Sequence, residues 1–248
     1  MNFIVILICL FLQRFLNLYI QVSNAWFNIY FSWLAPLLKK CNKWLALVIV
    51  ILPFLIILGL LQFFLIHRSF GMFYLVLSCA ILFFCIDFRD LRRQKPGYDT
   101  NDAVLSQSFK NFFPGLFWFA ILGPYGIIIY FILSLLHKIP VHKNDPSAET
   151  LTKLAAQIQS IADWVPAKLL GFTFALGGRI KNGFSYCLKN WQLSHKKNQQ
   201  FIIEAGDAAL GTPAKTSANA LQLAFSLIDR SIIIWIIVIG LTSFLLLL

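Results

Sequence analysis

Four long stretches of the chain carry no charged side chain, and they constrain the fold more than any other feature of the sequence. Each contains between 17 and 25 residues. A membrane-spanning helix needs about 20 apolar residues, whereas a spanning strand appears as a segment of about ten residues that alternates apolar and polar side chains. The sequence therefore predicts an all-α, polytopic integral membrane protein with about four transmembrane helices, at residues 44–66, 70–86, 112–136 and 231–248.

The composition agrees with a bilayer as the solvent of this chain. Hydrophobic residues make up 59% and charged residues 12% of the sequence, and the mean hydropathy is +0.75. An ordinary soluble domain has about 25% charged residues, and a soluble protein of this size could not bury so much apolar surface. We expect a single membrane domain over residues 1–248, with the lipid bilayer as its partner.

The formal net charge of +11 is also explained by a membrane location. Lysine and arginine residues flank the apolar stretches, as is typical of the cytoplasmic side of a membrane and of contact with lipid headgroups. The sequence contains no nucleic-acid-binding motif. Nucleic acid is therefore not expected as a partner.

The cysteines and histidines give no sign of a metal or a cofactor. No C-x-x-C and no H-E-x-x-H motif occurs. Three of the five cysteines lie in apolar stretches, where a free thiol behaves as a small hydrophobic group. We expect five free thiols, at Cys9, Cys41, Cys79, Cys85 and Cys187, and neither a metal site nor a cofactor.

Residues 1–38 are apolar but carry polar side chains at intervals of three or four, and they show no basic region or cleavage site of a removed signal peptide. This spacing places the polar side chains on one face of a long N-terminal helix. The stripe is explained either by an interfacial helix or by a cavity inside the bundle, because polar groups at membrane depth face protein or water. In the second case Arg14, Asn17 and Gln21 are candidate ligand-binding residues.

The predicted span at residues 112–136 contains two helix-breaking pairs, Pro114-Gly115 and Gly123-Pro124. Two such pairs indicate a kinked or discontinuous helix. A broken helix leaves backbone groups that can coordinate a ligand, although packing alone also explains it.

Residues 137–230 repeat apolar side chains at helical spacing and lack strand alternation, which predicts several amphipathic helices packed against the membrane helices. With four spans, residues 87–111 and 137–230 lie on opposite faces of the membrane. Near the helix ends, the face that includes residues 87–111 has eight lysines and arginines and the other has five, which favours the first as cytoplasmic.

The segment at residues 163–169 reads D-W-V-P-A-K-L. It resembles the D-W-x-P-x-R-L stretch of a membrane-protein superfamily with two branches. One branch is AmpE, a Gram-negative inner-membrane protein tied to β-lactamase induction. The other is the cobinamide-phosphate synthase family, which joins cobyric acid to an amino-alcohol in cobalamin synthesis. Weaker matches are Phe117-Trp118, Gly123-Pro124 and Ala208-Ala209-Leu210-Gly211, and a C-terminal amphipathic helix that leads into the last span.

The departures from the pattern favour the AmpE branch. Lys168 stands where the family usually has arginine, and lysine lacks the bidentate fork that recognises a carboxylate or phosphate. The early G-D-P…H-P signature of the synthases has no counterpart in residues 1–60, and their glycine-rich segment is reduced at residues 204–211.

The resemblance implies a multi-pass regulatory protein of the Gram-negative inner membrane that acts in β-lactamase induction or cell-wall sensing. It implies as a partner another inner-membrane or cell-wall-recycling protein, and no catalytic residues. The alternative that it leaves open is an amide-forming enzyme of cobalamin synthesis.

Three residues of the 163–169 segment are candidates for ligand binding. Asp163 precedes a predicted helix and is placed either to cap it or to bind a cation or an amine. Trp164 is either an interfacial anchor or part of the same site. Lys168 would hold a phosphate, assisted by the dipole of the helix N-terminus.

Overall fold

The structure, a computed structural model, describes residues 2–16, 25–38, 41–68, 72–86, 100–139, 146–211 and 218–245, and these residues form helices and short connections without a strand. The all-α prediction is confirmed. In chain order the helices are α1 (Asn2–Leu16), α2 (Ala25–Leu38), α3 (Lys43–Arg68), α4 (Met72–Cys85), α5 (Asn101–Asn111), α6 (Phe113–Leu122), α7 (Pro124–His137), α8 (Pro146–Ala162), α9 (Trp164–Gly177), α10 (Ile180–Lys189), η2 (His195–Lys197), α11 (Asn198–Leu210) and α12 (Ala218–Leu245).

Among these helices, two are long and apolar enough to cross a membrane, judged by length and composition. They contain the segments Lys43–Phe64 and Leu221–Leu245, which overlap the predicted spans 44–66 and 231–248. The predicted span 70–86 corresponds to α4, whose 14 residues reach about 21 Å at 1.5 Å per residue. That is shorter than the roughly 30 Å hydrocarbon core of a bilayer.

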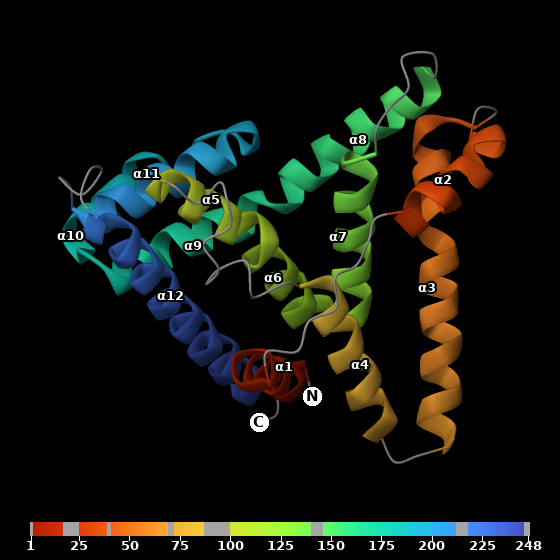
Figure 1. Cartoon of the computed structure of the whole chain (residues 1–248), viewed down its shortest axis with the longest axis horizontal. Helices are drawn as coiled ribbons and strands as arrows, with labels where there is room; N and C mark the ends of the chain where they lie inside the picture. The colour runs from red at the N-terminus through yellow and green to blue at the C-terminus, as the bar shows by residue number, and fades with distance from the viewer. Residues whose placement is uncertain are drawn as a thin grey trace.

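The described parts of the N-terminal region are the two helices α1 and α2, and residues 17–24, through which the single long helix predicted for residues 1–38 would run, lie outside the described residues. α1 packs against α4 and α12, where Phe3 lies on Gly240 of α12 and the Cys79 thiol of α4 faces the carbonyl of Val5. α2 packs against α3 near the start of that helix, and Figure 1 shows α1 and α2 at different ends of the molecule. Each helix buries its apolar face against a different neighbour, so the two do not continue each other.

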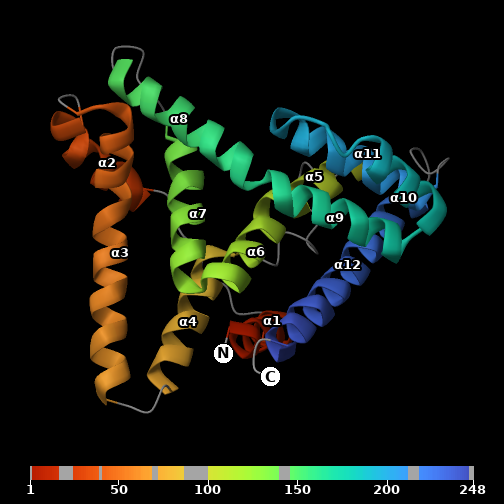
Figure 2. The same cartoon turned by 180° about the vertical axis from the view of Figure 1, so that it is seen from behind.

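The predicted span at residues 112–136 is a helical hairpin, in which α6 and α7 lie side by side as a V in both Figures 1 and 2. The chain turns at Gly123, whose φ of 64° suits glycine, and Pro124 opens α7 because a first-turn residue needs no N–H. A Cβ at Gly126 would collide with the Trp118 carbonyl, and Gly115 lies close to Ile127. The predicted discontinuity is confirmed, and the segment consists of two helices that fold back on each other instead of one continuous helix.

Two apolar cores hold the helices together. The larger core is built mainly from α1, α4, α5, α6, α9, α11 and α12. The smaller core joins α2, α3, α7 and α8. α7 therefore links the α3 side of the molecule to the α12 side, because its Ile127 belongs to the first core and its Leu136 to the second.

Helices α5, α8, α9, α10 and α11, with η2, gather where α3 and α12 begin, and we call this group the cap (Figure 1). α5 packs directly on α11, where Gly206 lies against Leu105. This packing does not confirm the prediction that residues 87–111 and 137–230 lie on opposite faces of the membrane, because it brings described parts of both regions together. The reason is the α6–α7 hairpin, because the chain leaves the cap along α6 and returns to it along α7.

Candidate functional site

Asp163 lies at the corner between α8 and α9 and is directed at the hairpin. The Tyr130 hydroxyl of α7 donates a hydrogen bond of 2.9 Å to Asp163 Oδ1, and Gln159 Nε2 donates one of 3.4 Å to the same hydroxyl oxygen. The side chain makes no capping hydrogen bond, so the interpretation of Asp163 as a helix cap is wrong. The cause is local, because Asp163 has helical φ and ψ of −75° and −17° and its own N–H is bonded to Gln159.

The surroundings of Asp163 change its acidity. Burial raises the pKa of this carboxyl to about 6, although the hydrogen bond from Tyr130 and the nearby Lys110 act to lower it. Burial penalises the charged form because the low-dielectric surroundings cannot solvate it. This group therefore titrates close to neutral pH, at the junction of α7, α8 and α9.

Trp164 and Lys168 point to a different place, the connection between α10 and α11. Trp164 Nε1 donates to the carbonyl of Leu193 at 3.2 Å, and Lys168 Nζ donates to the carbonyl of Asn190 at 3.0 Å. The Ser160 hydroxyl adds a third bond of this kind, to the carbonyl of His195 at 2.8 Å. Three side chains from α8 and α9 thus hold the backbone of residues 190–195.

Lys168 is the most deeply buried of these donors. Its side chain is 2% exposed, and its ammonium nitrogen lies 3.7 Å from the centre of the Phe201 ring. Burial lowers the pKa of Lys168. A carbonyl and an aromatic face are both favourable partners for a buried ammonium group, so the structure gives Lys168 a bracing role inside the cap.

The structure does not unite the predicted ligand-binding residues in one site. Asp163 faces α7, whereas Trp164 and Lys168 face residues 190–193. The side chains of Arg14, Asn17 and Gln21 lie outside the described residues.

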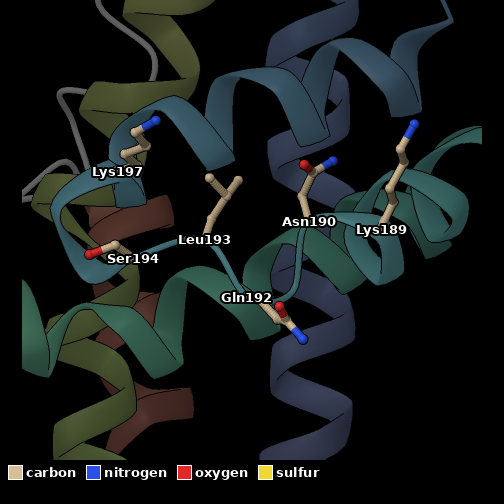
Figure 3. A pocket seen from close by; sticks show the side chains of 6 residues that line it. All are labelled: Lys189, Asn190, Gln192, Leu193, Ser194 and Lys197. Carbon is tan, nitrogen blue, oxygen red and sulfur yellow. The ribbon is translucent and has the colours of Figure 1, made fainter.

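A cavity of about 360 Å³ opens beside the connection that Trp164 and Lys168 hold (Figure 3). The sequence reasoning did not identify it. The only available signal was the concentration of lysine and amide side chains between α10 and α11. Its lining residues are Lys189, Asn190, Gln192, Leu193, Ser194 and Lys197.

The family described as "Regulatory signalling modulator protein AmpE" matches residues 98–246, which run from α5 to the end of α12. The chain belongs to the AmpE family. The cap, the hairpin and α12 are therefore the AmpE-family part of the molecule, and the resemblance seen at residues 163–169 is confirmed.

Two curated relatives carry the name "Cobalamin biosynthesis protein CobD". The protein from Stutzerimonas stutzeri is 28% identical over 130 residues, which are 51% of this chain and 43% of the relative. The protein from Chromobacterium violaceum is 26% identical over 125 residues, or 50% of this chain and 40% of the relative. The matched region thus spans less than half the length of either relative. No solved structure matches the chain.

Proposed function

We propose that this AmpE-family protein is a regulatory signalling protein of the Gram-negative inner membrane that acts in β-lactamase induction or cell-wall sensing. The observation that carries the proposal is the family match over residues 98–246, which contain the cap, the hairpin and α12. Two helices suited to crossing a membrane support the membrane location. Its partner would be another inner-membrane or cell-wall-recycling protein.

The distribution of positive charge supports a cytoplasmic cap. Lys39, Lys40 and Lys43 precede the apolar part of α3, and Arg230 precedes the charge-free part of α12. The connection at the other end of α3, residues 67–71, has Arg68 as its only basic residue apart from histidine. Basic residues near the ends of spanning helices favour the cytoplasmic side.

The direct test is deletion of the gene in a strain that has an inducible β-lactamase. We expect the β-lactamase activity reached after exposure to an inducing β-lactam to change, and a plasmid copy of the gene to restore it. Growth rate and activity without inducer serve as controls for a general membrane defect. Unchanged induction in the deletion strain would contradict the proposal.

The second candidate is an amide-forming enzyme of cobalamin synthesis, favoured by the similarity to the two relatives named CobD. Expression of this chain in a synthase-deficient strain supplied with cobyric acid separates the candidates. Rescue of cobalamin-dependent growth would support the enzyme, and failure of a stably expressed protein to rescue would support the regulatory function.

A further inference from the structure

Helix α10 has three distinct faces instead of the two of an ordinary surface helix. Gly183 and Cys187 are buried against the rest of the cap. Ile180 and Leu188 are apolar but 57% and 65% exposed. Lys181 and its neighbours on the remaining arc are polar and exposed: Asn182, Ser185 and Lys189. An exposed apolar arc beside an exposed basic arc is the pattern of a helix that lies in a membrane interface.

The exposed apolar arc of α10 continues onto α9 as one surface. The Phe172 ring of α9 contacts Phe184 of α10, with ring centres 5.2 Å apart, and Trp191 just beyond α10, at 5.7 Å. Leu169 and Leu176 extend the same surface along α9 and are 41% and 51% exposed. We call this surface the α9–α10 face, and its members are Leu169, Phe172, Leu176, Ile180, Phe184, Leu188 and Trp191.

The α9–α10 face lies at the level where α12 enters its charge-free stretch. Arg230 Nη1 donates a hydrogen bond of 3.0 Å to the carbonyl of Gly177, and a Cβ at Gly177 would contact Ile234 of α12. No charged residue follows Arg230 in the sequence. Because a spanning helix passes from headgroups to hydrocarbon at its last charge, the end of α9 is placed at the membrane boundary.

Basic side chains border the α9–α10 face on the side of the cavity. Leu188 and Trp191 belong to the face, whereas the adjacent Lys189 and Gln192 line the cavity together with Lys197 (Figure 3). The cavity lining includes two lysines and no acidic residue. Juxtaposed apolar and basic groups match the acyl chains and phosphate of an anionic phospholipid.

We propose that the α9–α10 face is a docking surface for the anionic phospholipid leaflet on the cap side of the membrane. Its apolar side chains contact acyl chains, and Lys189 and Lys197 hold headgroup phosphates in the cavity between α10 and α11. The cap thereby lies partly in the membrane instead of standing above it.

The first test measures where the apolar arc lies. A nitroxide is attached to Leu188→Cys in the full chain with its five native cysteines replaced, in nanodiscs containing phosphatidylglycerol. Ser185→Cys, on the exposed polar arc, is the matched control. Oxygen concentrates in lipid, so it is expected to relax the Leu188 label more than a water-soluble nickel chelate does. The Ser185 label is expected to be relaxed more by the chelate than by oxygen. Preferential access of the chelate to both labels would overturn the proposal.

The second test keeps the native cysteines and measures the lipid itself. Phosphatidylglycerol retained by the purified protein is counted by native mass spectrometry against phosphatidylcholine. Lys189→Gln and Lys197→Gln are each expected to weaken phosphatidylglycerol binding about fivefold, since each basic group near an anionic surface contributes measurably to attraction. Lys153→Gln, the same change on exposed α8, is the control. Equal retention of both lipids, or equal loss in all three variants, would refute the headgroup role.

Discussion

At the scale of the residue, Asp163 holds a negative charge where the charge is costly. Its carboxyl is enclosed by α7, α8 and α9, and burial raises its pKa from 3.8 to about 6. The hydrogen bond from Tyr130 compensates only in part. An acid whose pKa is higher in the folded than in the unfolded protein takes up a proton on folding, so its contribution to stability falls as the pH rises between the two values.

We therefore expect Asp163→Asn to flatten the pH dependence of stability between about pH 4 and pH 6. The amide oxygen can still accept the hydrogen bond from Tyr130, whereas the buried charge is removed. Above pH 6 the variant is expected to be more stable than the native protein by about 2–3 kcal/mol, and at pH 4 to match it. Thermal unfolding in detergent, followed from pH 4 to pH 8, measures this.

The control for this experiment is Asp229→Asn, the same chemical change at an exposed carboxylate of α12. It removes one carboxylate charge away from the α7–α8–α9 junction and so tests whether the flattening is specific to Asp163. If Asp163→Asn instead lowers stability equally at every pH, the carboxylate is needed as an ion and the cost assigned to its charge is wrong.

Lys168 illustrates a limit of reading single residues from a sequence. A lysine on an apolar helix suggests a ligand, yet here its ammonium group is bonded to the Asn190 carbonyl and lies on the Phe201 ring. Trp164 is used in the same way, through Leu193. Their partners lie more than 20 residues away in sequence, so only tertiary structure reveals that this motif braces the cavity wall.

At the scale of the element, the α6–α7 hairpin depends on close backbone approach. Gly126 has no room for a side chain, because a Cβ there would overlap the Trp118 carbonyl and the Leu122 side chain. Crowding of this kind cannot be relieved by a rotamer change, since one of the two partners is backbone. The two helices can therefore pack in their V only while position 126 is glycine.

Gly126→Ala is expected to lower the stability of the protein by about 1–3 kcal/mol through this overlap. Gly59→Ala in α3 is the matched control, because the nearest atom to its added Cβ is the Tyr125 hydroxyl at 3.6 Å, an ordinary contact. Alanine is the better helix former, so the control should be neutral or stabilising by up to about 1 kcal/mol. The unfolding temperatures of both variants in detergent test this expectation. Equal values would mean that α6 and α7 do not approach each other as closely at Gly126 as described.

The hairpin also shows why the predicted third span is not confirmed. Length and absence of charge measure whether a segment suits lipid, and residues 112–136 pass that criterion. The breaking pairs at 114–115 and 123–124 were visible, but only the second changes direction, because Gly123 has a positive φ and Gly115 does not. Pro114 and Gly115 lie within the first turn of α6, where a missing N–H is harmless.

At the scale of the whole molecule, the sequence predicted the class and the family well and the arrangement poorly. The helical fold and the long apolar helices α3 and α12 follow from local hydropathy. The family follows from a short motif at 163–169. The split of residues 1–38 into α1 and α2 does not, because each helix is placed by partners distant in sequence.

Contacts between distant residues also determine the membrane topology. Helix α5 can pack on α11 only if both ends of the α6–α7 hairpin lie on the same side of the membrane. We expect cysteines placed at Gln107 of α5 and Ser185 of α10, both exposed positions, to behave alike toward a membrane-impermeant maleimide in spheroplasts. With the cap in the cytoplasm, neither reacts until the membrane is permeabilised, whereas Ser69→Cys, between α3 and α4 in sequence, reacts in intact spheroplasts. Reaction at Gln107→Cys and Ser185→Cys but not at Ser69→Cys would reverse the proposed orientation and keep the hairpin. Opposite behaviour of Gln107→Cys and Ser185→Cys would require residues 112–136 to cross the bilayer, and the described packing of α5 on α11 would then be wrong.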